Sequence, residues 1–317
     1  MSHRKSIEFA PEAYRAAELI AGGVPAHRLR ARDIRRLSRG LVLHPEYDFD
    51  AFSYRARCIA VGMTLRPEHF LSRRSAATVF GIPCPLPVRG RVDVGSFSPH
   101  RAPQHRIVEG HRVKSGVLNW QRTDGITIPS AADVWCQLAA VVSFPDLVAA
   151  GDSLLSGARV LGGGGGRTDS LCTPADLELA RLRHRNTHGA PLRKRAIALL
   201  RWPVDSPPET YVRLAIVDAG FDEPVVNCRV VTRLRVLHAD LGYPLLRIAI
   251  EYEGGYHFAS TEQLRWDAAR RKQMTNAGWT VIIVMDDDLS DMADMLTTLA
   301  EAIESALARL NQATRIS

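Results

Sequence analysis

A run of five consecutive glycines, Gly162 to Gly166, constrains the fold of this chain more than any other feature. Glycine has no side chain to bury and loses the most conformational freedom on folding, so this run predicts a flexible break. The length of 317 residues also favours several domains. We expect a mixed α/β (α+β) multidomain protein divided into residues 1–57, 58–160, 161–200 and 201–317.

The overall composition is that of a globular protein with an excess of basic residues. Hydrophobic residues make up 46% of the chain, charged residues 24%, and the net charge of +7 favours an anionic partner such as nucleic acid. There is no apolar run of membrane-spanning length and no signal peptide, so we expect no membrane contact. The five cysteines lie far apart without a CxxC pair, which predicts reduced thiols and a cytoplasmic location. Nothing in the sequence indicates an oligomeric state.

A basic helical segment is expected after the glycine run. Thr173, Pro174 and Asp176 have the residue types of a helix start, and a second helical piece covers 192–200. Residues 181–201 contain basic side chains and no acidic one, among them Arg193, Lys194 and Arg195. Two interpretations stay open, a solvated basic surface and a surface that faces phosphates.

The last third predicts the order helix, strand, strand, helix, strand, helix. Pro207-Pro208 begins the first helix, and Gly220 is a plausible stop after it. A bend near Leu245 separates the first two strands. The expected elements cover residues 207–219, 234–240, 247–253, 263–277, 279–285 and 289–310.

The segment from Arg247 to Glu253 alternates with a period of two. Ile248, Ile250 and Tyr252 fall on one face of the expected strand, and Ala249, Glu251 and Glu253 on the other. The two glutamates are then roughly 7 Å apart. A bend near Leu245 would place Asp240 across from Ile250 or Glu251, so that three carboxylates meet on one patch of sheet.

Three converging carboxylates repel one another unless a cation or a proton neutralises them. Mg²⁺, with Mn²⁺ as a substitute, prefers such hard oxygen ligands, so Asp240, Glu251 and Glu253 are the candidate metal ligands. For two glutamates alone, a solvent-facing strand edge with salt bridges is the simpler interpretation, and Asp240 before the turn favours the metal. Glu209 is either a helix-dipole carboxylate or a fourth acid of the site. His257 follows Gly254-Gly255, which would allow its imidazole to return to the site.

These residues together resemble a known family. They are similar to the endonuclease-like domain related to very-short-patch mismatch repair, within the PD-(D/E)XK superfamily. The likeness lies in the stretches 239–244 and 248–254, His257, Asp267 with Arg270, and Gly278-Trp279. The resemblance covers about residues 200–310. It implies a magnesium-dependent endonuclease in defence or repair, with Asp240, Glu251, Glu253, His257 and Glu209 catalytic and Arg270 paired with an acid or a phosphate. Glu253 stands where many of these nucleases carry Lys and where the related pattern carries Asp.

The front of the chain resembles a second group. Residues 22–45 look like a winged helix-turn-helix of the abortive-infection antitoxin type, and residues around 69–85 are similar to the α+β domain that accompanies it. This implies DNA binding by a basic helix at 28–39. Its basic residues are Arg28, Arg30, Arg32, Arg35, Arg36 and Arg39.

Two functions follow as alternatives. The first is a metal-dependent nuclease that hydrolyses DNA, with RNA as a further substrate class that the sequence leaves open. The second is a DNA-binding regulator or antitoxin whose nuclease fold is inactive. The retained acidic set favours the enzyme, and the absent lysine favours the regulator.

Overall fold

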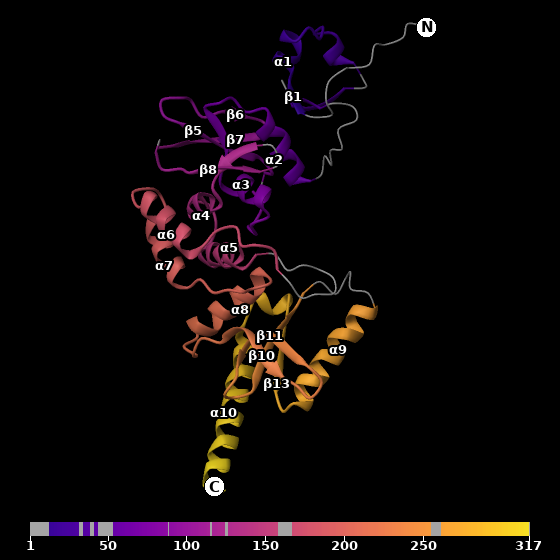
Figure 1. The fold of residues 1–317 in the computed structure, drawn as a ribbon, viewed down its shortest axis with the longest axis vertical. Coiled ribbons are helices and arrows are strands. Elements are labelled where there is room, and N and C mark those ends of the chain that lie inside the picture. Colours follow the sequence, from indigo (N-terminus) through magenta and orange to yellow (C-terminus); the bar gives the residue numbers. More distant parts are fainter. Residues whose placement is uncertain are drawn as a thin grey trace. The chain divides into compact units, whose positions relative to one another are not determined.

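The structure is a computed structural model, which describes residues 13–31, 34–38, 41–43, 53–87, 89–114, 116–123, 126–157, 167–254 and 261–316 (Figure 1). It is a mixed α+β protein with several small sheets. The chain forms two compact units, and both are discontinuous. Unit 1 comprises residues 1–147 and 172–195, and unit 2 comprises residues 148–171 and 196–317. The division therefore falls inside a helix and not at the glycine run, and most of the segment expected as linker belongs to unit 1.

Unit 1 begins with a small antiparallel sheet in the order β1-β3-β2, formed by β1 (Ala13–Arg15), β2 (Arg35–Ser38) and β3 (Leu41–Leu43). The short helix α1 (Ala16–Ala21) and the 3-10 turn η1 (Arg28–Arg30) lie between its first two strands. The expected continuous helix over 28–39 is wrong, because these residues supply η1 and β2. Leu29 and Ile34 are buried against Leu19 and Val42, and this packing imposes the observed path on the arginine-rich segment.

The rest of unit 1 contains a mixed sheet in the order β4-β5-β7-β6 and a separate hairpin, β8-β9. Strands β5 and β7 run parallel, and the other pairs in the mixed sheet are antiparallel. The elements are α2 (Tyr54–Met63), β4 (His69–Leu71), α3 (Arg73–Phe80), β5 (Val92–Phe97), β6 (Gln104–His105), β7 (Val108–Val113), β8 (Trp120–Thr123), β9 (Ile126–Pro129) and α4 (Ala131–Leu138).

Two hydrogen-bond networks around buried charged side chains hold the helices of unit 1 together. In the first, Asp133 of α4 accepts hydrogen bonds from Arg183 at 2.9 Å, His184 at 3.0 Å and the Ser130 hydroxyl at 2.7 Å. In the second, Arg193, which is 1% exposed, donates to the carbonyl oxygens of Cys136, His184 and His188 and thereby closes the turn between α6 (Pro174–Arg183) and α7 (Ala190–Ala198). The start of α6 is the predicted one, with a complete capping box between Thr173 and Asp176.

Unit 2 is built on one four-stranded sheet in the order β10-β11-β12-β13. The chain runs through α8 (Pro207–Asp218), β10 (Val225–Val231), β11 (Val236–Tyr243), β12 (Ile248–Glu253), α9 (Thr261–Asn276), β13 (Thr280–Met285), the 3-10 turn η3 (Asp287–Leu289) and α10 (Ala293–Ile316). Strand β10 was not expected. Strands β12 and β13 are parallel and joined through α9, and the other pairs are antiparallel.

Helices cover both faces of this sheet. Ile248 and Ile250 pack on one face with residues of α8 and α10, and Ala249 packs on the other face with Met274 of α9 (Figure 1). The predicted alternation of β12 is therefore confirmed. Each large aliphatic side chain buried in this way contributes roughly 1.5–3 kcal/mol to folding, so the two faces fix the register of the strands.

A buried ionic network ties α8 to the part of helix α5 (Phe144–Ser156) that belongs to unit 2. Arg213 donates to Asp152 at 2.8 Å and to Glu223 at 2.7 Å, and Asp152 also accepts from the Thr210 hydroxyl at 2.8 Å and the Arg201 backbone N–H at 2.7 Å. Burial raises the pKa of Asp152 to about 6, and the charge of Arg213 opposes this rise.

Within the described helices, none is both long and apolar enough to span a bilayer. All five cysteines are free thiols.

Candidate active site

The acidic residue at the start of α8 points back toward the segment before the helix. Pro207 and Pro208 occupy the first turn, where a missing N–H costs nothing, and Glu209 follows them. Its carboxylate accepts from the Asp205 backbone N–H at 3.1 Å and from the Ser206 hydroxyl at 2.9 Å. Burial and then the charge of Asp240 raise the pKa of Glu209 to about 8. Glu209 therefore binds the segment that precedes α8 and lies close enough to Asp240 to be affected by its charge, while its role as a fourth acid of the site stays a prediction.

Asp240 sits where the alternation of two strands breaks. Cys228 and Ala239 pair across β10 and β11 and face α9, whereas the next pair, Val226 and Leu241, faces α8 and α10. Residues two apart in a regular strand share a face, so one residue in each strand interrupts the pattern. Those residues are Asn227 and Asp240, which the register places opposite each other.

The backbone at this point carries a rare conformation. Asn227 has φ of 49°, in the left-handed region where asparagine is the most tolerated residue after glycine. On the other strand, the pairing of β11 with β12 extends to Leu241 and Ile250, so Asp240 lies next to Glu251 as predicted. The Asp240 carboxylate then accepts the backbone N–H of Tyr252 at 2.8 Å in place of a strand partner.

Glu251 is the most deeply buried acid of the sheet, at 3% exposed. Burial is the largest cause that raises its pKa to about 8, the charge of Asp240 adds to it, and the charge of Arg270 opposes it. Arg270 of α9 forms an ion pair with one carboxylate oxygen of Glu251 and also donates to the His238 carbonyl. The other oxygen, Oε1, is buried and accepts no hydrogen bond from any described residue.

Glu253, two residues further along β12, repeats this arrangement. Its Oε1 forms an ion pair with Arg271 of α9, and its Oε2 is buried without a hydrogen-bond partner among the described residues. Successive arginines of one helix therefore neutralise the two glutamates of one strand face. On each glutamate one carboxylate oxygen remains without a hydrogen-bond partner among the residues that the structure describes.

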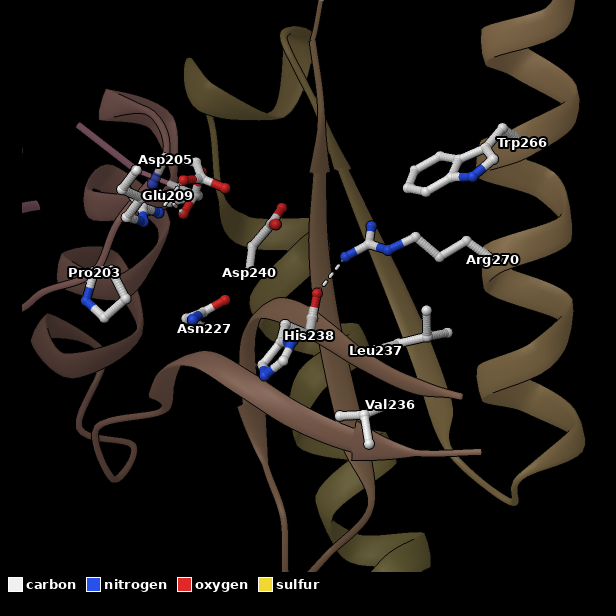
Figure 2. A pocket seen from close by; sticks show the side chains of 11 residues that line it. Pro203, Asp205, Glu209, Asn227, Val236, Leu237, His238, Asp240, Trp266 and Arg270 are labelled. Atoms are coloured by element: carbon white, nitrogen blue, oxygen red, sulfur yellow. Dashed lines mark hydrogen bonds and ion pairs between the residues drawn. The ribbon is translucent and has the colours of Figure 1, made fainter. Parts of the chain in front are cut away.

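A cavity of about 380 Å³ opens beside these acids. Figure 2 shows Glu209 and Asp240 bordering it, while Arg270 extends from α9 toward the backbone of His238. Glu251 and Glu253 do not line the cavity. The remaining wall residues include Asp205, Asn227 and Trp266, none of which we predicted from the sequence. Asn227 was detectable in principle, as the single amide side chain within the apolar run of residues 225–231.

Two further observations concern a metal. His257 lies outside the described residues. Among those that the structure does describe, no group of three or more His, Cys, Asp and Glu side chains is arranged to hold a metal ion. In the present arrangement, arginines provide the positive charge next to Glu251 and Glu253.

The basic residues proposed for nucleic-acid contact divide into three groups. Arg193 is buried in unit 1 with its guanidinium on carbonyl oxygens, so its expected contact with nucleic acid is corrected to a structural role. Lys194 and Arg195 are exposed, and Arg195 stacks 4.5 Å from the ring centre of Phe144. In the N-terminal segment Arg30, Arg35 and Arg36 are exposed and Arg28 is half-buried. Arg32 and Arg39 lie outside the described residues.

Comparison with known proteins yields no assignment. No protein-family model matches this chain. No curated protein matches its sequence.

Proposed function

We propose that unit 2 is a Mg²⁺-dependent nuclease that hydrolyses phosphodiester bonds of DNA. The observation that carries this proposal is the group formed by Asp240 and two buried carboxyl groups, Glu209 and Glu251, whose pKa values are raised first by burial and then by the charge of Asp240. Proteins rarely bury acids beside one another without a function that uses them, and perturbed acids beside a cavity are typical of active sites. The resemblance of residues 200–310 to the repair-endonuclease family points to the same chemistry.

The chemistry of the donors fits a hard divalent cation. Glu251 Oε1 and Glu253 Oε2 are buried oxygens with no hydrogen-bond partner in the described part of the chain, and such atoms gain most from a cation. Asp240, Glu251 and Glu253 are the residues that would hold Mg²⁺ or Mn²⁺, once the arginine pairs yield to it. When bound, such an ion supplies an acidified water and neutralises charge on a phosphate.

The protein's own groups would hold and orient the reacting atoms. Glu209 carries a proton near neutral pH because its pKa is raised, so it is suited to donate a proton or a hydrogen bond to an oxygen in the cavity. The Tyr252 backbone N–H fixes the orientation of the Asp240 carboxylate. Arg270 lines the cavity, and its guanidinium is the group that would bind a phosphate there.

The experiment is incubation of the full chain with supercoiled plasmid and with single-stranded DNA and RNA in Mg²⁺, Mn²⁺ or EDTA. We expect cleavage that needs the metal, and loss of this cleavage in Asp240→Asn with DNA binding retained. Glu209→Gln should slow cleavage less. Asp218→Asn, on the exposed last residue of α8, is the matched control and should cleave as the wild type does. Equal cleavage by Asp240→Asn and wild type would place the active site elsewhere.

A second function has its own supporting observation. The ion pairs of Glu251 with Arg270 and of Glu253 with Arg271 neutralise these acids without any metal. We infer that a protein which binds DNA and does not cut it, as a regulator or antitoxin, would retain such pairs. Binding of DNA without cleavage under every metal condition would favour this function. In both proposals the small N-terminal sheet of unit 1, with the exposed Arg30, Arg35 and Arg36, is the DNA anchor.

A further inference from the structure

A second cavity, in unit 1, has no part in the proposed nuclease chemistry. Its volume is about 260 Å³, slightly below the roughly 300 Å³ at which pockets for small organic ligands begin. Its walls come from the start of α3, strand β7 with the residues after it, α4, and the turn between α6 and α7. The polar lining residues are Arg73, His111, Arg112, Lys114, Gln137, His184, Asn186, Thr187 and His188, and the others are Val113, Val117, Cys136 and Ala140.

The charges on this wall have one sign. Three of the lining residues are permanent cations, and none of the described aspartates and glutamates lines the cavity. Asp133, the nearest acid of α4, is already paired with Arg183 and His184. Arg112 and Lys114 are exposed, so they would draw an anion toward the cavity from solvent.

The side-chain amide of Gln137 has a buried N–H donor without an acceptor among the described residues. Its side-chain oxygen accepts the backbone N–H of Arg73 at 3.0 Å, and since a backbone N–H can only donate, the opposite atom must be the amide nitrogen. This nitrogen is buried and has no hydrogen-bond partner within the described chain, in a residue only 9% exposed. A buried donor without an acceptor destabilises the folded protein, and an acceptor bound in the cavity would remove that cost.

Arg73 is the second polar side chain that would contact a ligand in this cavity. It has φ of 48°, which is rare for a residue with a side chain, and its guanidinium makes no hydrogen bond or ion pair with the described residues. Asp93 and Glu109 act on Arg73 only through space and do not line the cavity. The neighbouring His111 has a buried Nδ1 without a partner in the described structure, and burial followed by the charge of Arg73 lowers its pKa to about 3. The ring is therefore neutral and retains one N–H donor.

We propose that this cavity binds a phosphate monoester, held by Arg73 and the Gln137 amide, with the small organic part of the ligand against Val113, Val117 and Ala140. A phosphate presents several acceptor oxygens to converging donors, and arginine matches its geometry. The apolar part of the wall favours an ester over inorganic phosphate. A free nucleotide and the phosphorylated end of a nucleic-acid strand both carry this chemistry.

The test is calorimetric titration of the full chain with inorganic phosphate, AMP, and a tetranucleotide with and without a 5′-phosphate, at constant ionic strength. We expect AMP to bind more tightly than inorganic phosphate. Arg73→Gly removes the cation and suits the left-handed backbone, so it should weaken AMP binding about ten- to hundredfold without loss of thermal stability. Gln137→Glu keeps the acceptor for the Arg73 N–H and replaces the donor with a negative oxygen, so it should weaken binding at least as much.

Two control variants separate this site from general charge effects. Arg247→Gly removes an exposed arginine that also has positive φ, at 52°, in unit 2. Gln121→Glu makes the same charge change as Gln137→Glu in unit 1, on β8. Both should bind AMP as the wild type does.

Several outcomes would overturn the proposal. The first is that none of the four probes binds. The second is that the control variants weaken AMP binding as much as Arg73→Gly and Gln137→Glu do. The third is that the two tetranucleotides bind with equal affinity while AMP does not bind. Binding of AMP alone assigns a free nucleotide as the ligand. Preference for the phosphorylated tetranucleotide over the unphosphorylated one assigns a strand end.

Discussion

Replacing Glu251 with glutamine removes one charge from the acidic site and nearly preserves its shape. In the wild type the pKa of this carboxyl is raised from 4.5 to about 8 when the protein folds. The folded protein therefore keeps a proton that the unfolded chain releases. The stabilising effect is complete below about pH 4.5 and is lost as the pH rises through 8, so the free energy of unfolding falls across this window. Glutamine does not titrate and removes that dependence.

The size of this change in the free energy of unfolding follows from the shift in the pKa of Glu251. A change from 4.5 to about 8 corresponds to roughly 5 kcal/mol between the two ends of the window. Glu209 titrates in the same range beside the same Asp240, so the protons are shared and the difference attributable to one substitution is about 2–5 kcal/mol. The interaction with Arg270 is already contained in this shift, because the charge of Arg270 opposes the rise in the pKa of Glu251.

Differential scanning calorimetry of the full chain in EDTA, from pH 5 to pH 9, measures this difference. For a unit of this size each kcal/mol moves the melting temperature by about 2–4 °C. The wild type should lose stability toward pH 9, and Glu251→Gln should lose markedly less. Glu304→Gln, on the exposed side of α10, is the control and should follow the wild type. The same pH dependence in wild type and Glu251→Gln would refute the raised pKa, and with it the electrostatic basis of the site.

Three further outcomes are expected. Arg213→Met leaves Asp152 buried without its cation, which should lower the stability of unit 2 by about 3–5 kcal/mol in thermal melts, and a change below 1 kcal/mol would contradict the network. Asn227→Gly relieves the positive φ, so it should raise the free energy of unfolding by about 0.4–1 kcal/mol in urea titrations, whereas a loss would mean that the amide side chain itself stabilises the strand. Binding of Mn²⁺, followed by calorimetric titration, should strengthen as the pH rises from 5 to 8 because the ligands must lose protons, and affinity that stays flat or falls would exclude Glu251 as a ligand.

The parts of the fold that sequence patterns predicted are those determined by neighbours in the chain. The capping box at Thr173 involves residues three apart, and the faces of β12 follow from a period of two. Both are local, and local rules apply before any tertiary contact forms. The position of Asp240 next to Glu251 followed in turn from the short turn between their strands.

The rest depended on contacts between distant segments. We expected Arg270 to pair with an acid or a phosphate, but nothing near Glu251 in sequence indicates that Glu251 is this acid, because the pairing requires α9 to cross back over the sheet. The arginine-rich stretch at 28–39 has the composition of a helix, yet burial of its apolar residues decides its path. Arg193 has the same side chain as its exposed neighbour Arg195, and only the fold distinguishes a turn-closing arginine from a surface one.

The placement of Asp152 restricts how this protein can be divided by evolution or by engineering. The glycine run suggests a natural cut, with everything after it inherited or expressed as a free-standing module. Such a fragment, starting at Arg167, would lack α5 and with it Asp152, the fully buried one of the two carboxylates that pair with Arg213. An exchange of modules between relatives would have to carry residues 148–157 along with the C-terminal part. Recombination at the glycines alone would leave the buried Arg213 with Glu223, a partly exposed acid, as its one remaining partner in this network.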